Sequence, residues 1–309
     1  MKHLLRVALV ADLVALMTLM LGSWTRINGA GLTCPDWPLC HGHLLPALGD
    51  GTLWEWSHRL LAFAVAPLVV VLIAVAWRQR RRSPFVTPMT SAIVVLFLVQ
   101  VFLGAETVRL ANSPLSVVLH WATAMAFIAS LSAMAVFAAA SDAANPPRDA
   151  SRGSHLLTFV LGLTAATAFV TMCVGAYVSS SGAGLACLSI PGCAGNVVVY
   201  TSGESVQMLH RFFAATTLIC AAGALALAWA RTASIRVRAA VLLGTTLVAI
   251  QVLLGLLNVV LRLPTNLREA HAVNAALVFL SFFVSAAFSM LDAAPHSHAL
   301  PLAEESPPR

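Results

Sequence analysis

The hydrophobic pattern of the chain consists of long apolar runs separated by short polar segments. A helix that crosses a bilayer needs about 20 apolar residues. Eight runs meet this length, at residues 4–24, 54–77, 89–108, 116–140, 155–178, 205–230, 238–260 and 268–291. Hydrophobic residues make up 59% of the chain and charged residues 10%, which excludes an ordinary soluble domain. The pattern therefore predicts an all-α membrane protein with eight transmembrane helices.

Charge patterning predicts the topology. The net charge of +6 does not indicate nucleic-acid binding, because the basic residues lie at the ends of the apolar runs. Most of them lie at the start of the first run or in and beside every second connection: Lys2, Arg6, Arg78, Arg80, Arg81, Arg82, Arg148, Arg152, Arg231, Arg236 and Arg238. Basic connections face the cytoplasm, so we expect both termini inside and segments 25–53, 109–115, 179–204 and 261–267 outside. The first run is too long for a signal peptide and is expected to be a retained helix. It contains Asp12, which either bonds a neighbouring helix or has a functional role.

The two halves of the chain repeat one another. The segment from Gly29 to Cys34, Gly-Ala-Gly-Leu-Thr-Cys, recurs as Gly-Ala-Gly-Leu-Ala-Cys from Gly182 to Cys187. Three single residues recur in the same order: Gln100 as Gln251, His58 as His210, and His120 as His271. All four intervals lie between 151 and 153 residues. Matches in order at a constant interval indicate an internal duplication.

The duplication predicts the domain organisation. Each half holds four runs, an even number, so both halves enter the membrane in the same direction and a pseudo-two-fold axis along the membrane normal is expected. We therefore expect two tandem four-helix bundles, at residues 1–140 and 155–291. A proline-containing cytoplasmic linker at 141–154 joins them, and a disordered cytoplasmic tail follows at 292–309.

Four histidines lie near the outer ends of the helices that run from outside to inside: His58, His120, His210 and His271. Two histidines on two helices of one bundle can face each other across a gap, which is the arrangement for bis-histidine ligation of a haem iron. A lone histidine would more often form an interhelical hydrogen bond, but four at repeated positions favour ligation. A metal site without haem is less favoured, because carboxylate or thiolate ligands are expected there and only Glu55 is well placed.

One acid separates the two halves. Glu55 precedes His58 by three residues and so shares its helix face, whereas the matching residue before His210 is Gln207, which cannot ionise. This difference suggests chemistry in the first half and a cofactor that passes electrons in the second. Arg59 and Arg211 each follow a histidine. They either pair with haem propionates or are interfacial arginines that reach lipid headgroups.

The outer segments contain two cysteine pairs with equal spacing, Cys34 with Cys40 and Cys187 with Cys193. Disulfides persist outside the cytoplasm, so structural disulfides are the favoured interpretation and redox-active thiol pairs are the alternative. Zinc binding is not favoured, because no C-x-x-C pair occurs.

These motifs together resemble the bacterial haem A synthase family: the run from Gly29 to Cys40, Glu55-x-x-His58-Arg59, His120, His210-Arg211 and His271. The resemblance covers nearly the whole chain. It implies conversion of haem O to haem A, by oxidation of a porphyrin methyl group to a formyl group, for haem-copper terminal oxidases. It also implies a b-type haem on His210 and His271, substrate haem O near His58 and His120, and Glu55 as the catalytic acid/base. The second cysteine loop departs from the family pattern, which weakens any catalytic role for that pair.

Two functions from other classes remain open at this point. A membrane cytochrome with two bis-histidine haems fits the ligands, but two equivalent haems do not need the difference between Glu55 and Gln207. A transporter fits the repeats but does not explain four histidines at one depth. The expected partners are haem O, haem O synthase, an electron donor, membrane lipid and a second copy of the chain. The expected location is the bacterial plasma membrane.

Overall fold

The structure is a computed structural model that describes residues 1–142, 155–193 and 201–293. Within these residues eight long helices follow one another: α1 (Lys2–Ile27), α2 (Thr52–Gln79), α3 (Val86–Arg109), α4 (Pro114–Asp142), α5 (His155–Ser180), α6 (Ser202–Ala230), α7 (Ile235–Val260) and α8 (Thr265–Ala293). A short 3-10 turn, η1 (Ala183–Leu185), follows α5. The expected linker and tail lie outside the described residues, apart from their first two residues, which belong to α4 and α8.

Each helix contains the apolar run that predicted it. The shortest has 24 residues, which at a rise of 1.5 Å per residue extends over about 36 Å. That exceeds the hydrocarbon core of a bilayer, which is about 30 Å thick. All eight helices are long and apolar enough to cross a membrane. The described residues therefore confirm the prediction of an all-α membrane protein with eight candidate spans.

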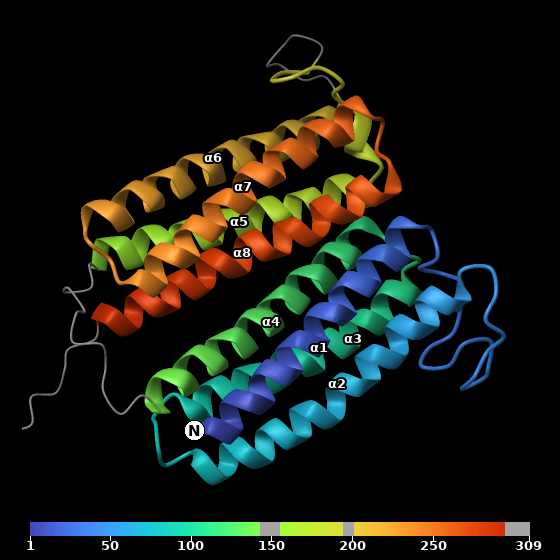
Figure 1. The fold of residues 1–309 in the computed structure, drawn as a ribbon. Coiled ribbons are helices and arrows are strands. Elements are labelled where there is room, and N and C mark those ends of the chain that lie inside the picture. Colours follow the sequence, from blue (N-terminus) through green and yellow to red (C-terminus); the bar gives the residue numbers. More distant parts are fainter. Residues whose placement is uncertain (143–154, 194–200, 294–309) are drawn as a thin grey trace, which may run out of the picture.

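The helices form two groups in space, α1 to α4 and α5 to α8 (Figure 1). In the first group α1 and α3 each pack against both α2 and α4, so α2 and α4 stand opposite each other. In the second group α5 and α7 each pack against both α6 and α8, so α6 and α8 stand opposite each other. The two groups meet where α4 packs against α5 and α8, and where α1 packs against α8.

Helix α4 lies between the two groups, because it packs against α1 and α3 in its own group and against α5 and α8 in the other. Its side chains Met125, Ile128, Leu131 and Met134 are almost completely shielded from solvent. These residues follow one another at intervals of three, so they turn around the helix and α4 is buried on more than one side. Helix α4 thus joins the two groups through apolar packing.

The mid-membrane carboxylate Asp12 makes a contact between helices. The Ser132 hydroxyl of α4 donates a hydrogen bond of 2.8 Å to Asp12 Oδ2 on α1. A hydroxyl donor from a neighbouring helix is a common partner for a polar group at this depth. This contact supports the interhelical reading of Asp12.

Candidate functional site: two pairs of histidines beneath disulfide loops

The four histidines lie near the N-terminal ends of the helices that stand opposite each other. His58 is on α2 and His120 on α4, whereas His210 is on α6 and His271 on α8. All four side chains are partly buried. The structure therefore places one histidine pair in each group of four helices.

Two of the histidines are held by backbone carbonyl groups. His58 Nδ1 lies 3.0 Å from the carbonyl oxygen of Thr18 on α1, and His210 Nδ1 lies 3.1 Å from that of Thr171 on α5. A carbonyl can only accept, so Nδ1 carries the proton in both rings. This tautomer leaves the lone pair on Nε2, the usual arrangement when a histidine binds a metal and a hydrogen bond fixes its orientation. Sequence analysis did not identify the two threonine carbonyls.

Four glycines provide the space for these rings. A Cβ added at Gly22 would lie 2.5 Å from His58 Cε1, and one at Gly175 would lie 2.9 Å from His210 Cε1. On α3 and α7, Gly104 and Gly255 stand in the same relation to the other two histidines, at 3.2 Å and 3.3 Å from Cε1 of His120 and His271. Every ring is therefore cradled by a neighbouring helix at a position where a side chain would intrude. Sequence analysis did not identify these glycines, although Gly104 and Gly255 follow the repeated glutamines.

The other two histidines contact glutamine amides. Gln100 Nε2 lies 3.4 Å from His120 Nε2, and Gln251 Nε2 lies 3.1 Å from His271 Nε2. An amide nitrogen can only donate, so Nε2 of each ring holds a lone pair. Within the described residues Nδ1 of both rings is buried without a hydrogen-bond partner.

The histidine pair of the second group fits a haem iron. The ring centres of His210 and His271 are 6.3 Å apart, with the ring planes at 68°. Two metal–imidazole bonds of about 2 Å each, together with the two ring radii, also give a separation of about 6 Å. Both rings have an Nε2 lone pair, and both rest on a glycine. The donor set is therefore suitable for bis-histidine ligation.

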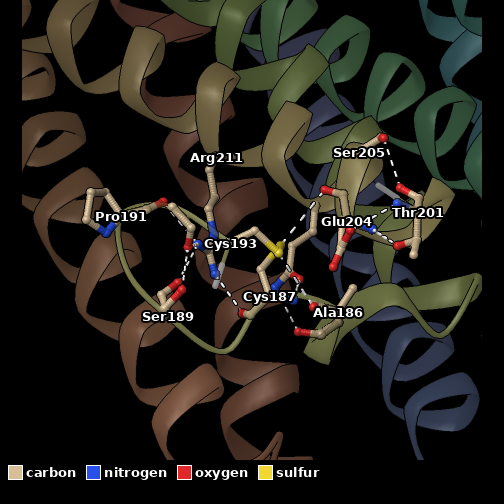
Figure 2. The surroundings of a disulfide bond; sticks show 12 residues. Ala186, Cys187, Ser189, Pro191, Cys193, Thr201, Glu204, Ser205 and Arg211 are labelled. Atoms are coloured by element: carbon tan, nitrogen blue, oxygen red, sulfur yellow. Dashed lines mark hydrogen bonds between the residues drawn. A yellow bond between two sulfur atoms is a disulfide. The ribbon is translucent and has the colours of Figure 1, made fainter. Parts of the chain in front are cut away.

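Both cysteine pairs form disulfides, Cys34 with Cys40 and Cys187 with Cys193, as predicted. Each disulfide closes a loop just beyond the histidines, and the arginine that follows a histidine binds each loop. Arg211 donates to the carbonyl oxygens of Ser189, Pro191, Gly192 and Cys187 at 2.7 to 3.0 Å (Figure 2). Arg59 donates in the same way to those of Asp36, Leu39 and Cys34 at 2.5 to 2.9 Å. The arginines therefore act as clamps on the loops.

Glu55 and Gln207 occupy one structural position in the two halves. Glu55 Oε2 accepts hydrogen bonds from the Cys34 amide and the Thr33 hydroxyl, both at 2.9 Å. Gln207 Oε1 accepts from the Cys187 amide at 2.5 Å. The halves differ in the other oxygen: Glu55 Oε1 forms a buried ion pair with Arg59 at 2.5 Å, which an amide cannot form. Glu55, the ionisable member of this matched pair, is thus held against the first loop and its arginine.

The first loop is further ordered by Asp36. Its carboxylate accepts hydrogen bonds from the backbone amides of Gly42, at 2.8 Å, and His41, at 2.6 Å. These bonds, that of Gly42 first, hold the pKa of Asp36 below its usual value. The imidazole of His41 contacts the Thr33 carbonyl at 2.9 Å, which is a local contact within the loop.

Polar contacts also join the two groups close to the histidines. The Ser23 hydroxyl of α1 donates to Glu269 Oε2 of α8 at 2.8 Å, and Arg26 of α1 donates to the Ser179 hydroxyl of α5 at 3.1 Å. Ser23 follows the glycine that cradles His58, and Glu269 lies two residues before His271. The interface between the two groups thus carries polar contacts close in sequence to residues that hold or ligate at the two histidine sites.

The fold and the site define a class of protein: an eight-span membrane protein with paired, oriented histidines beneath disulfide-closed loops. Comparison with known families agrees with this class. The model of the COX15-CtaA family, described as cytochrome oxidase assembly protein, matches residues 5–283. The chain belongs to this family.

Similar proteins are haem A synthases. The chain is 27% identical to the haem A synthase of Bacillus licheniformis, over 94% of each chain. It is 28% identical to that of Shewanella oneidensis, over 90% of this chain and 93% of the relative. It is 31% identical to that of Shouchella clausii, over 68% of this chain and 71% of the relative. These similarities confirm the resemblance drawn from the motifs.

Proposed function

We propose that this protein is a haem A synthase, which oxidises a methyl group of haem O to a formyl group and so provides haem A for haem-copper terminal oxidases. Family membership and the similarity to haem A synthases along nearly the whole chain support this function. The observation that carries it is the set of four histidines, each oriented by a hydrogen bond and seated on a glycine. This arrangement suits two planar macrocycles held between helices.

In the second half His210 and His271 would hold the iron of a b-type haem as the resident cofactor. The 6.3 Å separation of their rings supports this assignment. When bound, this haem supplies one-electron transfer between an external donor and the substrate site. The chain itself orients one ligand through the Thr171 carbonyl, which fixes the ring of His210. Gln251 holds the backbone carbonyl of His271 and, without iron, also contacts Nε2 of its ring.

The first half binds substrate haem O near His58 and His120, and Glu55 is the catalytic acid/base. Oxidation of a methyl carbon releases protons, and a carboxylate close to the site can accept them. Glu55 lies about one helical turn from His58, because three residues separate them. Its carboxylate forms a buried ion pair with Arg59, the residue that follows His58. Arg59 and Arg211 use their terminal N–H groups on loop carbonyls, so contact with a haem propionate requires these donors to be shared.

The wider arrangement follows from the repeat and the charge pattern. We infer two four-helix domains, at residues 1–140 and 155–291, related by a pseudo-two-fold axis along the membrane normal. Both termini face the cytoplasm of a bacterial plasma membrane, and the two disulfide loops face outward. Haem O synthase is the expected source of the substrate, and a homo-oligomer is the expected assembly.

A membrane cytochrome that only transfers electrons is the alternative function. The matched histidine pairs fit it equally well. The Glu55–Arg59 ion pair favours the synthase, because the second half shows that an amide is sufficient to hold the loop. Turnover of haem O separates the two functions, since an electron carrier would return it unchanged.

Expression in cells that make haem O but lack haem A synthase tests the proposal. Haems extracted from the membranes are separated by chromatography and identified by mass. We expect haem A to form with the wild-type chain and not with the empty vector. Haem O alone, from cells that contain folded protein with a b-type spectrum, would instead identify an electron-transfer cytochrome.

A further inference from the structure

The two glutamines beside the histidines provide a comparison within one chain. Gln100 on α3 and Gln251 on α7 occupy matching positions, and each donates its amide to Nε2 of a histidine. That nitrogen holds the lone pair, so it is the atom with which each histidine binds iron. Ligation therefore ends the contact between glutamine and ring nitrogen in both halves. Whether each amide then stays in place depends on its other hydrogen-bond partners.

In the second half Gln251 is fixed at both ends of its amide. Gln251 Nε2 donates to the backbone carbonyl of His271 at 3.0 Å, and Gln251 Oε1 accepts from Asn274 Nδ2 at 2.7 Å. Asn274 is itself buried and donates to the carbonyl of Leu247 at 2.9 Å. The amide of Gln251 thus stays in place without its contact to the imidazole. This is a structural glutamine.

Within the described residues of the first half, Gln100 has no counterpart to the hydrogen bond that Asn274 donates to Gln251. The residue that matches Asn274 is Thr123, and within the described residues Gln100 Oε1 is buried without a hydrogen-bond partner. A buried amide oxygen without a donor is costly, and native proteins rarely retain one. The hydrogen bond of the Gln100 amide among the described residues goes to His120 Nε2, so iron binding leaves this amide beside the substrate with an acceptor to satisfy.

We propose that Gln100 recognises the hydroxymethyl intermediate of the reaction, an inference that rests on the proposed function. The first oxidation replaces a methyl C–H by C–O–H with one atom of dioxygen, and the other atom leaves as water after two electrons from the external donor and two protons are added. The new hydroxyl is a donor that haem O does not offer at this carbon. The second oxidation passes two electrons and two protons from that alcohol to a second dioxygen, which becomes two waters with two further donor electrons and two protons, and leaves a formyl group. A formyl group cannot donate, so the bond to Gln100 is lost in the product.

The consequence is selective retention. Gln100 Oε1 binds the intermediate more tightly than either the substrate or the product, because only the intermediate has the donor. It keeps the half-oxidised haem in place for the second step and then lets haem A leave. Gln100 is therefore a specificity and positioning residue, and not a proton donor or acceptor.

The first test is Gln100→Leu, which keeps the approximate volume and removes the amide. Spectral titration of the purified protein with haem O and with hydroxymethyl haem gives the preference between the two. We expect the wild type to prefer hydroxymethyl haem by about two- to tenfold, the range for one neutral hydrogen bond, and Gln100→Leu to lose this preference. In haem-O-producing cells the ratio of hydroxymethyl haem to haem A should rise by a similar factor.

Gln251→Leu is the matched control. It should lower the content of b-type haem, while the preference of the substrate site for hydroxymethyl haem stays at the wild-type value. Thr123→Asn is the complementary variant, because it supplies the partner that Asn274 provides to Gln251. Thr123→Asn should reduce the preference for hydroxymethyl haem although the Gln100 amide is intact. It therefore still tests the proposal if Gln100→Leu does not fold. Added to Gln100→Leu, it should have no further effect.

The outcomes separate this inference from the function on which it rests. If wild-type chain makes no haem A, the proposed function fails and the inference fails with it. If the wild type makes haem A, but Gln100→Leu and Thr123→Asn both keep the wild-type preference and product ratio, only the role of Gln100 is wrong.

Discussion

The substitution Gly175→Ala tests whether His210 is held as a metal ligand. The added Cβ would lie 2.9 Å from His210 Cε1, whereas non-bonded carbon atoms pack at about 3.5–4.0 Å. In the haem-free protein the ring can turn away. When the ring is bound to iron its position is fixed, so the clash acts mainly on the bound form. Overpacking of this kind costs about 1–3 kcal/mol, which lowers the affinity for haem by about 5- to 150-fold.

The assay is haem titration of the purified protein, followed by the reduced-minus-oxidised spectrum. Gly162→Ala is the matched control, because it lies on the same helix and its Cβ would meet no described atom within 4 Å. It should retain the full haem content. Gly22→Ala is the equivalent change in the first half, with a Cβ 2.5 Å from His58 Cε1. It should leave the b-type spectrum intact and reduce formation of haem A.

A wild-type affinity for haem in Gly175→Ala would refute this reasoning. It would mean that the ring of His210 does not stay against α5 when haem is bound. Equal losses in Gly175→Ala and Gly162→Ala would refute it as well, since the effect would then come from the helix and not from the ring.

Three further predictions concern individual side chains. His210→Ala should abolish the low-spin b-type spectrum and His58→Ala should retain most of it; the opposite result would exchange the roles of the two halves. Glu55→Gln should keep the first loop and the b-type haem, because the second half uses an amide at this position, yet chromatography of extracted haems should find little or no haem A; wild-type amounts would reduce Glu55 to a structural acid. Alkylation without reductant followed by mass spectrometry should find Cys34 and Cys40 unlabelled, and full labelling of both would contradict the disulfide.

The helices were predictable because the membrane imposes a simple rule. A span of about 20 apolar residues must be helical, and every predicted run lies within one observed helix. The helices extend beyond the runs at most ends, since polar residues such as Thr52 and Arg109 continue a helix at the interface. Hydropathy records where the hydrocarbon core ends, not where the backbone hydrogen bonds end.

The site was predictable only in part, for a physical reason. The repeat identified the histidines, Glu55 and the cysteine pairs, because these residue types carry the chemistry. The partners of Arg59 depend on loop carbonyls, and any residue type has a carbonyl. Gly22 makes room for the ring of His58 because it has no side chain, and this matters only because α1 passes close to that ring. Such contacts arise from the three-dimensional packing and leave almost no trace in residue type.

The direct succession of histidine and clamping arginine has a thermodynamic consequence. His210 and Arg211 share one peptide unit, so the backbone that positions the ligand also positions the guanidinium that holds the loop from Ser189 to Gly192. Coupling between two such equilibria is reciprocal. If the closed loop strengthens haem binding by a given free energy, bound haem stabilises the closed loop by the same amount. Digestion of the outer loops by an external protease should therefore be slower in the haem-loaded protein, and the degree of protection measures how strongly cofactor and loop depend on each other.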